Sequence, residues 1–252
     1  MMAGLARGLV VTLGLLVLWQ VVVWATGVPR YLLPEPLAVF RALWLQWPLI
    51  LHHALLTLAE IVLGLVLGLI LGALMALILS SSAVLNRWLL PVVIASQAVP
   101  VFALAPLLVL WLGYGMASKV AMAVLVIFFP VTASFHDGLR RVERGWIEQA
   151  RVMDAGAASI LWQIRLPAAL PAFGAGARIA AVVAPIGAVI GEWVGSAGGL
   201  GYLMLHANGR MQTDLLFAAL LVLCLMAMAL WLLVDRLLRR LIFWQPDTLH
   251  AA

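Results

Sequence analysis

The chain has 252 residues, of which 66% are hydrophobic and 10% are charged, and its mean hydropathy is +1.15. Such a composition has too little polar surface to cover a soluble globule, so it predicts an integral membrane protein. The net charge of +5 requires no nucleic-acid partner, because the arginines gather beside apolar segments, where lipid headgroups attract them. The single cysteine, Cys224, excludes an intramolecular disulfide.

Six stretches of the chain are nearly free of charge over the roughly 20 residues that a helix needs to cross a bilayer. They lie at about 8–26, 54–79, 88–112, 119–136, 168–193 and 215–234. Each is expected to be a helix, because lipid offers an open backbone no hydrogen-bond partner. The pattern predicts an all-α polytopic membrane protein with about six transmembrane helices and a single domain over residues 1–252.

The first stretch follows Arg7, as the apolar region of a secretory signal peptide would. Its apolar run is longer than such a region usually is, and no clear small-residue cleavage site follows it. A retained helix is therefore favoured. The segment from Pro29 to His53, with Trp44 and Trp47, predicts a surface segment carrying a short interfacial helix. In the second stretch, glycines recur at 64, 68 and 72, a spacing that permits close helix packing.

The third stretch contains Ser96, Gln97 and Pro100, and Pro106 follows. Proline removes helix hydrogen bonds, which is tolerated at membrane depth against protein or a wet cavity. Ser96, Gln97 and Pro100 are therefore candidates to line a transport pathway. A packed, kinked helix whose polar side chains bond to neighbouring helices is an equal alternative.

Charges inside apolar stretches are costly, so they are expected near a helix end or beside a partner. Glu60 and Arg178 are interpreted as structural anchors, and a direct pair between them would require offset helices. Glu192 is a better functional candidate, because it ends the fifth stretch next to a glycine-rich loop at 195–201. That loop cannot be a stable continuous helix. It is expected to bend toward the pathway, with Trp193, Gly199, Gly201 and Tyr202 as further candidates, or else to be a passive connector.

Basic residues are distributed unequally between the two ends of the stretches. With the N-terminus inside, ten lie on the inner side and four, namely Arg30, Arg41, Lys119 and Arg210, lie on the outer side. The positive-inside rule then predicts that both termini and the loop at 137–167 are cytoplasmic. Within that loop, Leu139, Val142, Trp146, Ala150 and Met153 recur at helical spacing, which predicts an amphipathic helix whose apolar face needs a partner or the lipid surface.

Several motifs resemble one family of permeases. They are Gly138-Leu139, Glu148-Gln149-Ala150, Ile164 to Pro171, Gly176-Ala177-Arg178, Gly191-Glu192-Trp193 and Gly198 to Tyr202. Together they resemble the ABC importer permeases for sulfonates, taurine, nitrate and thiamine-precursor pyrimidines, with the hydroxymethylpyrimidine branch most similar. The resemblance implies a type I importer fold in the cell inner membrane, a homodimer, two cytoplasmic ATPase copies and an extracytoplasmic solute-binding protein.

The resemblance also implies roles for the loop. Glu148 would form an ion pair or helix-positioning contact with the ATPase, although it could pair with Arg151 on its own helix. The coupling set comprises Glu148, Gln149, Ala150, Met153, Asp154, Ala155, Gly156 and Ala157, with Met153, Ala155 and Ala157 as apolar contacts. The family has glycine where this chain has Asp154, and Gly156 lies two residues later. Asp154 tolerates left-handed backbone and can cap the next helix, so the turn is expected to survive with a shifted hinge.

No nucleotide, metal or cofactor chemistry is expected from this chain. The only lysine, Lys119, is not in a phosphate-binding loop, so the energy for transport must come from a partner. The histidines lack metal-binding spacing. A secondary transporter would more often show duplicated halves. An intramembrane hydrolase would need an activated nucleophile, for which Ser196 with His206 is only a weak candidate. These two classes remain the alternatives to a permease.

Overall fold

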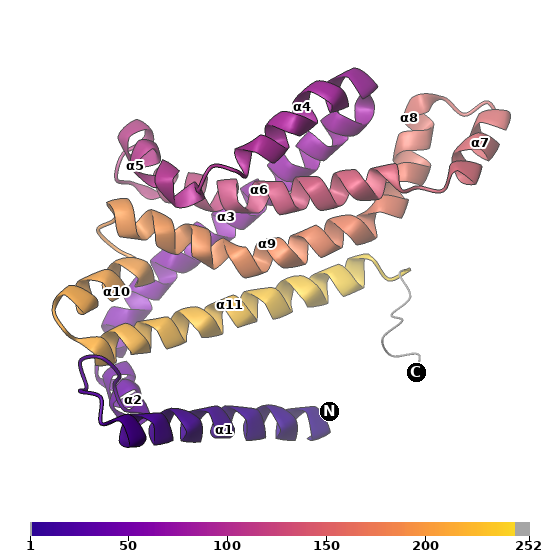
Figure 1. Ribbon diagram of the computed structural model, residues 1–252. Helices are drawn as coiled ribbons and strands as arrows, with labels where there is room; N and C mark the ends of the chain where they lie inside the picture. The colour runs from indigo at the N-terminus through magenta and orange to yellow at the C-terminus, as the bar shows by residue number, and fades with distance from the viewer. Residues whose placement is uncertain (1, 245–252) are drawn as a thin grey trace. The chain divides into compact units, whose positions relative to one another are not determined.

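The computed structural model describes residues 2–244, and every regular element within them is helical. Figure 1 shows the helices in chain order: α1 (Met2–Thr26), α2 (Pro36–Leu45), α3 (Trp47–Ser81), α4 (Ala83–Ser96), α5 (Val101–Leu112), α6 (Met116–Arg140), α7 (Arg144–Val152), α8 (Ala157–Ile160), α9 (Leu166–Gly195), α10 (Leu200–Gly209) and α11 (Thr213–Leu241). A π-helical turn, η1 (Leu161–Arg165), joins α8 to α9. The expected all-α class is confirmed.

Four helical segments of the described chain are long and apolar enough to cross a membrane: Trp47–Ser81, Met116–Arg140, Ala157–Gly195 and Thr213–Leu241. A fifth is added if α4 and α5 count as one span, and the apolar part of α1, Val10–Thr26, is shorter than these. The expectation of one helix over 88–112 is wrong, because α4 and α5 meet at an angle of 96°. Pro100 explains the break, since it lacks an N–H group and disfavours helical backbone at the residue before it.

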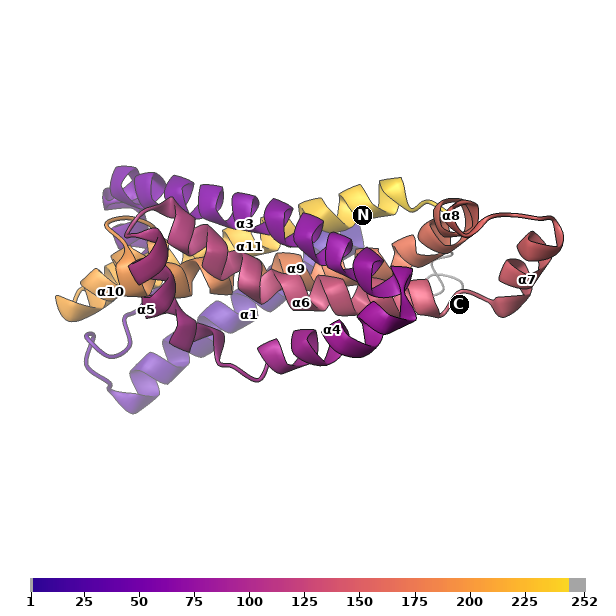
Figure 2. The same cartoon turned by 90° about the horizontal axis from the view of Figure 1, so that it is seen from above.

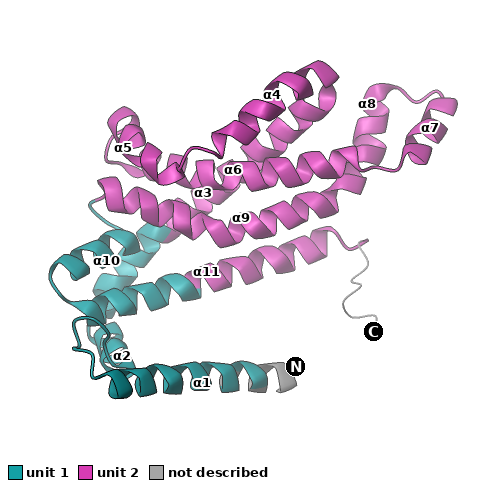
Figure 3. Ribbon diagram, viewed as in Figure 1, with its two compact units in different colours: residues 1–57, 197–225 teal, residues 58–196, 226–252 magenta. Residues whose placement is uncertain are grey.

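The chain divides into two compact units, coloured separately in Figure 3. Unit 1 comprises residues 1–57 and 197–225, and therefore holds α1, α2, α10 and the first parts of α3 and α11. The α2 helix lies in the segment where a short helix was expected, and it starts at a proline, which suits a first helical position. The Thr213 hydroxyl donates to the Arg30 carbonyl at 2.9 Å, and the rings of Trp19 and Phe217 lie 5.7 Å apart.

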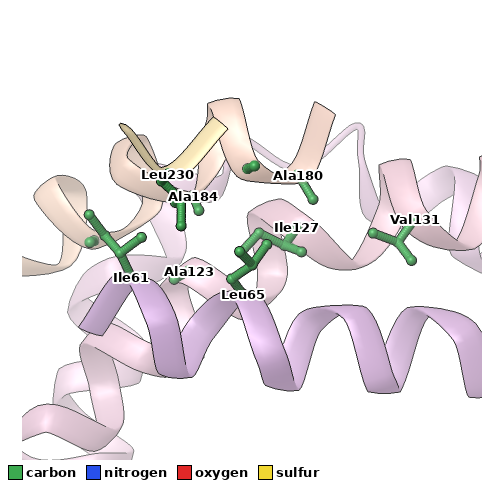
Figure 4. Close-up of a cluster of buried hydrophobic side chains, with 10 residues drawn as sticks. Ile61, Leu65, Ala123, Ile127, Val131, Ala180, Ala184 and Leu230 are labelled. Atoms are coloured by element: carbon green, nitrogen blue, oxygen red, sulfur yellow. The ribbon is translucent and has the colours of Figure 1, made fainter. Parts of the chain in front are cut away.

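Unit 2 comprises residues 58–196 and 226–252 and is organised around α6 and α9. These two helices run side by side in both views, and the segment from α7 to α8 that connects them lies beyond their ends (Figures 1 and 2). Figure 4 shows a buried apolar cluster between the helices, with residues from α3, α6, α9 and α11. The labelled members are Ile61, Leu65, Ala123, Ile127, Val131, Ala180, Ala184 and Leu230.

Glycines bring the backbones of α3, α6 and α9 into close contact. A Cβ atom added to Gly68 of α3 would lie 2.5 Å from Ile127 Cγ2, and one added to Gly72 would lie 2.8 Å from Val131 Cβ. On α9, a Cβ at Gly187 would lie 2.7 Å from the Ala123 backbone. The glycine stripe that the sequence placed at 64, 68 and 72 is thus confirmed as a packing surface, and α9 has its own glycine against the other side of α6.

We expect Gly187→Val to destabilise unit 2, because its side chain would meet backbone that cannot rotate away. Overpacking of this kind costs about 1 to 3 kcal/mol, which thermal unfolding of the detergent-solubilised protein would detect. Gly14→Val is the matched control, since Gly14 is also helical but has no atom within 4 Å of an added Cβ. Equal unfolding temperatures for the two variants would contradict the packing account.

Candidate coupling hairpin and pathway residues

The coupling hairpin, defined here as residues 144–160, consists of α7, a tight turn and α8. Asp154 has φ +63° in this turn. The Ala155 N–H donates to the Ala150 carbonyl at 3.0 Å, and the Asp154 N–H donates to the Arg151 carbonyl at 2.9 Å. This pair of hydrogen bonds around a left-handed residue is the Schellman motif, which satisfies the last carbonyls of a helix.

The turn that was expected to survive the replacement of glycine by Asp154 is therefore present, with Asp154 itself in the left-handed conformation. Two details of the expectation are wrong. The hinge has not moved to Gly156, which has φ −68° and is the N-cap of α8. Asp154 also does not occupy the N-cap position of α8, because that position is Gly156. Aspartate can replace glycine in this turn because it tolerates left-handed backbone better than most other residues with a side chain.

The amphipathic helix expected from Leu139 to Met153 is interrupted. Leu139 belongs to α6, which ends at Arg140, and α7 starts at Arg144. Leu139, Val142 and Ala150 are buried, whereas Trp146 and Met153 are exposed. The apolar spacing therefore runs across two separate helices and does not describe one continuous face.

The described part of the coupling hairpin borders a groove of about 700 Å³. Its walls come from α7 and the turn after it, η1, the first turns of α9 and Trp244. The lining residues are Trp146, Gln149, Ala150, Met153, Gln163, Ile164, Pro167, Ala168, Pro171 and Trp244. Glu148 is exposed on α7, Ala155 is half-buried, and Gly156 and Ala157 are exposed. The hairpin thus brings the predicted coupling residues together on one projection of unit 2.

Apolar side chains on the hairpin are unusually exposed. Val152 is 88% exposed and Met153 is 75% exposed, and Trp162 in η1 is 62% exposed. The segment lies beyond the ends of α6 and α9 (Figure 1). In a segment outside the apolar spans, exposed apolar groups of this kind are typical of an interaction surface.

Intramembrane charges of unit 2 are paired in a way that the sequence did not indicate. Arg178 of α9 donates to Asp235 of α11 at 2.7 Å, and Arg239 donates to the other oxygen of Asp235 at 2.8 Å. Glu60 pairs instead with Lys119 Nζ at 3.0 Å. Asp235 and Lys119 were both missed as partners, because each lies far along the sequence from the residue that it neutralises.

The pathway candidates of unit 2 differ in exposure. Ser96, Gln97 and Pro100 are exposed at the break between α4 and α5, and the Ser96 hydroxyl donates to the Val93 carbonyl at 2.7 Å. Glu192 is only 1% exposed, while the adjacent Trp193 is 52% exposed. Glu192 therefore points into the helix packing, whereas Trp193 lies on the surface of its unit.

The glycine-rich segment breaks the helix as expected, but the break is shorter than the predicted loop. Gly195 ends α9, and Gly201 already lies in the first turn of α10. Gly199 is the N-cap of α10 with φ +109° and ψ 165°, a region that is essentially restricted to glycine. Gly199 and Gly201 are buried and Tyr202 is half-buried.

Two side chains of α3 receive the first amides of α10 within unit 1. The Gly199 N–H donates to His53 Nδ1 at 3.0 Å, and the Leu200 N–H donates to the Thr57 hydroxyl at 2.7 Å. The Tyr202 ring lies 5.8 Å from the His53 ring and 4.1 Å from the His206 ring. Neither His53 nor Thr57 was expected at this site, although their spacing of four residues puts two polar groups on one face of an apolar helix.

The chain is similar in sequence to known transport proteins over most of its length. Residues 64–243 match the family described as binding-protein-dependent transport system inner membrane component. The chain is 52% identical to a probable ABC transporter permease protein of Haemophilus influenzae, over 91% of this chain and 94% of that one. It is 40% identical to the riboflavin transport system permease protein RibX of Chloroflexus aurantiacus, over 96% and 91% of the two chains. It is 37% identical to the formylaminopyrimidine transport permease protein ThiX of Halalkalibacterium halodurans, over 92% of each chain.

Solved structures share the fold. An inward-facing structure of the MetNI methionine ABC transporter has a TM-score of 0.59 at 21% identity, covering 82% of this chain and 97% of that one. A crystal structure of an amino acid ABC transporter with histidines has a TM-score of 0.62 at 17% identity, covering 82% and 98%. The likeness supports the type I importer permease fold expected from the sequence.

Proposed function

Because the chain belongs to the binding-protein-dependent transport system inner membrane component family, and is thus a multi-pass inner-membrane permease of an ABC importer, we propose that it carries a thiamine-precursor pyrimidine inward. A separate ATPase drives the import, and an extracytoplasmic binding protein delivers the solute. The observation that supports this role best is the exposed apolar coupling hairpin, together with the family match over residues 64–243.

The solute class is supported by the relatives. The two relatives whose names specify formylaminopyrimidine and riboflavin are 37% and 40% identical to this chain. A putative aliphatic sulfonates permease of Bacillus subtilis and a taurine permease of Escherichia coli are 30% and 31% identical. Formylaminopyrimidine and riboflavin both contain a pyrimidine ring, so a nitrogen heterocycle of that type is favoured over a sulfonate, taurine or nitrate.

The ATPase partner is supported by the surface chemistry of the coupling hairpin. Val152 and Met153 would be buried on docking, and Glu148, exposed beside them, would make the charged contact. Burial of apolar surface favours association, while a charged contact sets the register. In the proposed assembly, residues 1–252 act as one permease domain, two copies pair around the pathway, and each copy holds one ATPase. The same arrangement places the hairpin and both termini in the cytoplasm.

Within the proposed pathway, Ser96, Gln97 and Pro100 supply exposed polar atoms and backbone carbonyls at the break between α4 and α5. The turn at Gly199 and the side chains of Trp193 and Tyr202 serve at the outer end. Arg178 and Glu60 act as anchors between helices, because each has an oppositely charged partner. Glu192 is buried and interacts with Glu60, which supports a role in helix packing rather than in direct contact with the solute.

Reconstitution tests the proposal. We expect proteoliposomes that hold this permease with its cognate ATPase and binding protein to accumulate labelled hydroxymethylpyrimidine only when ATP and the binding protein are both present. Riboflavin, taurine and nitrate are the competing solutes, and strong uptake of one of these instead would replace the proposed cargo. Uptake driven by an ion gradient without the ATPase would identify a secondary transporter, and solute cleavage without uptake would identify a hydrolase.

A further inference from the structure

Three ionisable side chains meet inside unit 2, one from each of three packed helices. We call Glu60 of α3, Lys119 of α6 and Glu192 of α9 the carboxyl–lysine cluster. Lys119 Nζ lies 3.0 Å from Glu60 Oε1, and the carboxyl group of Glu192 is within hydrogen-bonding range of the Glu60 carboxyl group. Glu60 and Glu192 are each 1% exposed and Lys119 is 7% exposed. The cluster is therefore shielded from solvent in unit 2 itself.

The helices around the carboxyl–lysine cluster are closely packed. A Cβ atom added to Gly191 of α9 would lie 3.0 Å from the Lys119 Cα. The α5 helix brings apolar Val109 against Gly195, and the ring of Tyr114 lies beside it. The charged groups that act on Glu60 are Glu192 from α9 and Lys119 from α6. The balance of charge in the cluster thus depends on two carboxyl groups and one ammonium group.

Two ionised carboxylates beside one ammonium group would leave a net negative charge in this buried place. Burial of an uncompensated charge is costly, and a second like charge at short range adds to that cost. An ionised carboxylate also has only acceptor atoms, so two of them cannot hydrogen-bond to each other. Glu60 Oε2 is buried and receives no hydrogen bond from the described residues. A proton shared between the two carboxyl groups would remove the net charge and would supply the donor that a hydrogen bond between them needs.

We propose that Glu60 and Glu192 share one proton beside Lys119, so that the cluster is a neutral, buried proton-binding site that joins α3, α6 and α9. The O–H group of one carboxyl donates to the other carboxylate, and the Lys119 ammonium group donates to Glu60 Oε1. Loss of the proton leaves one excess negative charge, which weakens the attachment of the end of α9 to α3. The site does not depend on which solute the protein carries.

The first test uses the wild-type protein. The chain has five glutamates, at 35, 60, 143, 148 and 192, so labelling only the glutamate side-chain carboxyl carbon gives a simple solid-state NMR spectrum. In lipid at neutral pH we expect a signal from a protonated carboxyl group, accompanied by an infrared carbonyl band that shifts slowly in D2O because the cluster is buried. A spectrum that contains only ionised glutamates would overturn the proposal without any variant.

Variants then assign the signal. Glu60→Gln and Glu192→Gln should each remove the protonated carboxyl signal. In either variant the one remaining carboxyl group is ionised, because the Lys119 ammonium group balances its charge. Glu143→Gln is the control, since Glu143 is exposed, and it should leave the signal unchanged. Lys119→Met should about double the signal, because neither carboxyl group then has a cation beside it. If only one glutamine variant removes the signal, or if Lys119→Met abolishes it, the proton is not shared and the proposal is wrong.

Discussion

Glu148→Arg should reduce ATP-dependent uptake by about tenfold or more, which corresponds to about 1.4 kcal/mol of lost coupling, while the permease still inserts and folds. Glu148 is exposed on α7, and no salt bridge within residues 2–244 includes it. Its replacement therefore removes no ion pair among those residues. The loss should appear instead as weaker co-purification of the ATPase, which is measured alongside uptake.

Glu143→Arg is the matched control for this result. It makes the same change of charge in the same cytoplasmic loop, but Glu143 lies at the other end of α7, as its N-cap. A positive charge there is disfavoured by the helix dipole by at most about 1 kcal/mol, so most uptake should remain. Full uptake with Glu148→Arg would show that this carboxylate makes no essential ATPase contact. Equal losses in both variants would indicate a general effect of charge.

Gly199→Ala should abolish most uptake, because alanine is strained at φ +109° and ψ 165°, by on the order of 1 to 3 kcal/mol. Relief of that strain moves the Gly199 N–H away from His53 Nδ1, to which it donates at 3.0 Å. The start of α10 would then lose its attachment to α3 within unit 1. Uptake by proteoliposomes and thermal unfolding of the solubilised protein should be measured on the same preparations.

Gly209→Ala is the control for Gly199→Ala, since Gly209 ends the same helix, has ordinary helical backbone and has no atom within 4 Å of an added Cβ. It should keep both uptake and stability. If Gly199→Ala unfolds at a lower temperature yet transports normally, the turn is a structural connector. If uptake is lost while the unfolding temperature changes little, the turn takes part in gating the pathway.

Sequence reasoning succeeded where the decisive physics is local. Apolar stretches without charge identified most of the membrane-crossing helices, because the cost of burying charge in lipid is a property of each segment. The survival of the turn followed from the tolerance of the Asp154 side chain for left-handed backbone, although the expected shift of the hinge toward Gly156 was wrong. The glycine stripe of α3 also followed from spacing within one helix.

Prediction from the sequence failed where the decisive contact joins segments that are distant along the chain. Lys119 was counted among the basic residues of the outer side, at the start of the stretch 119–136, and its pairing with Glu60, which lies 59 residues earlier, was not foreseen. The spacing from Leu139 to Met153 predicted one helix because apolar periodicity by itself does not reveal a break between two helices. The bend between α4 and α5 was underestimated because proline predicts a kink without fixing its angle.

The close glycine contacts in unit 2 have a mechanical consequence. Gly64 of α3 and Gly187 of α9 both lie against Ala123 of α6, so at this level no long, flexible side chain separates the three helices. The three helices should therefore move as one stiff beam, and α6 alone, with 25 residues, extends for about 37 Å. The coupling hairpin sits at one end of this beam and the cluster of Glu60, Lys119 and Glu192 at the other. A push of the ATPase on the hairpin would thus be delivered almost undiminished to the opposite end, so the elastic joints of the permease must lie outside this contact.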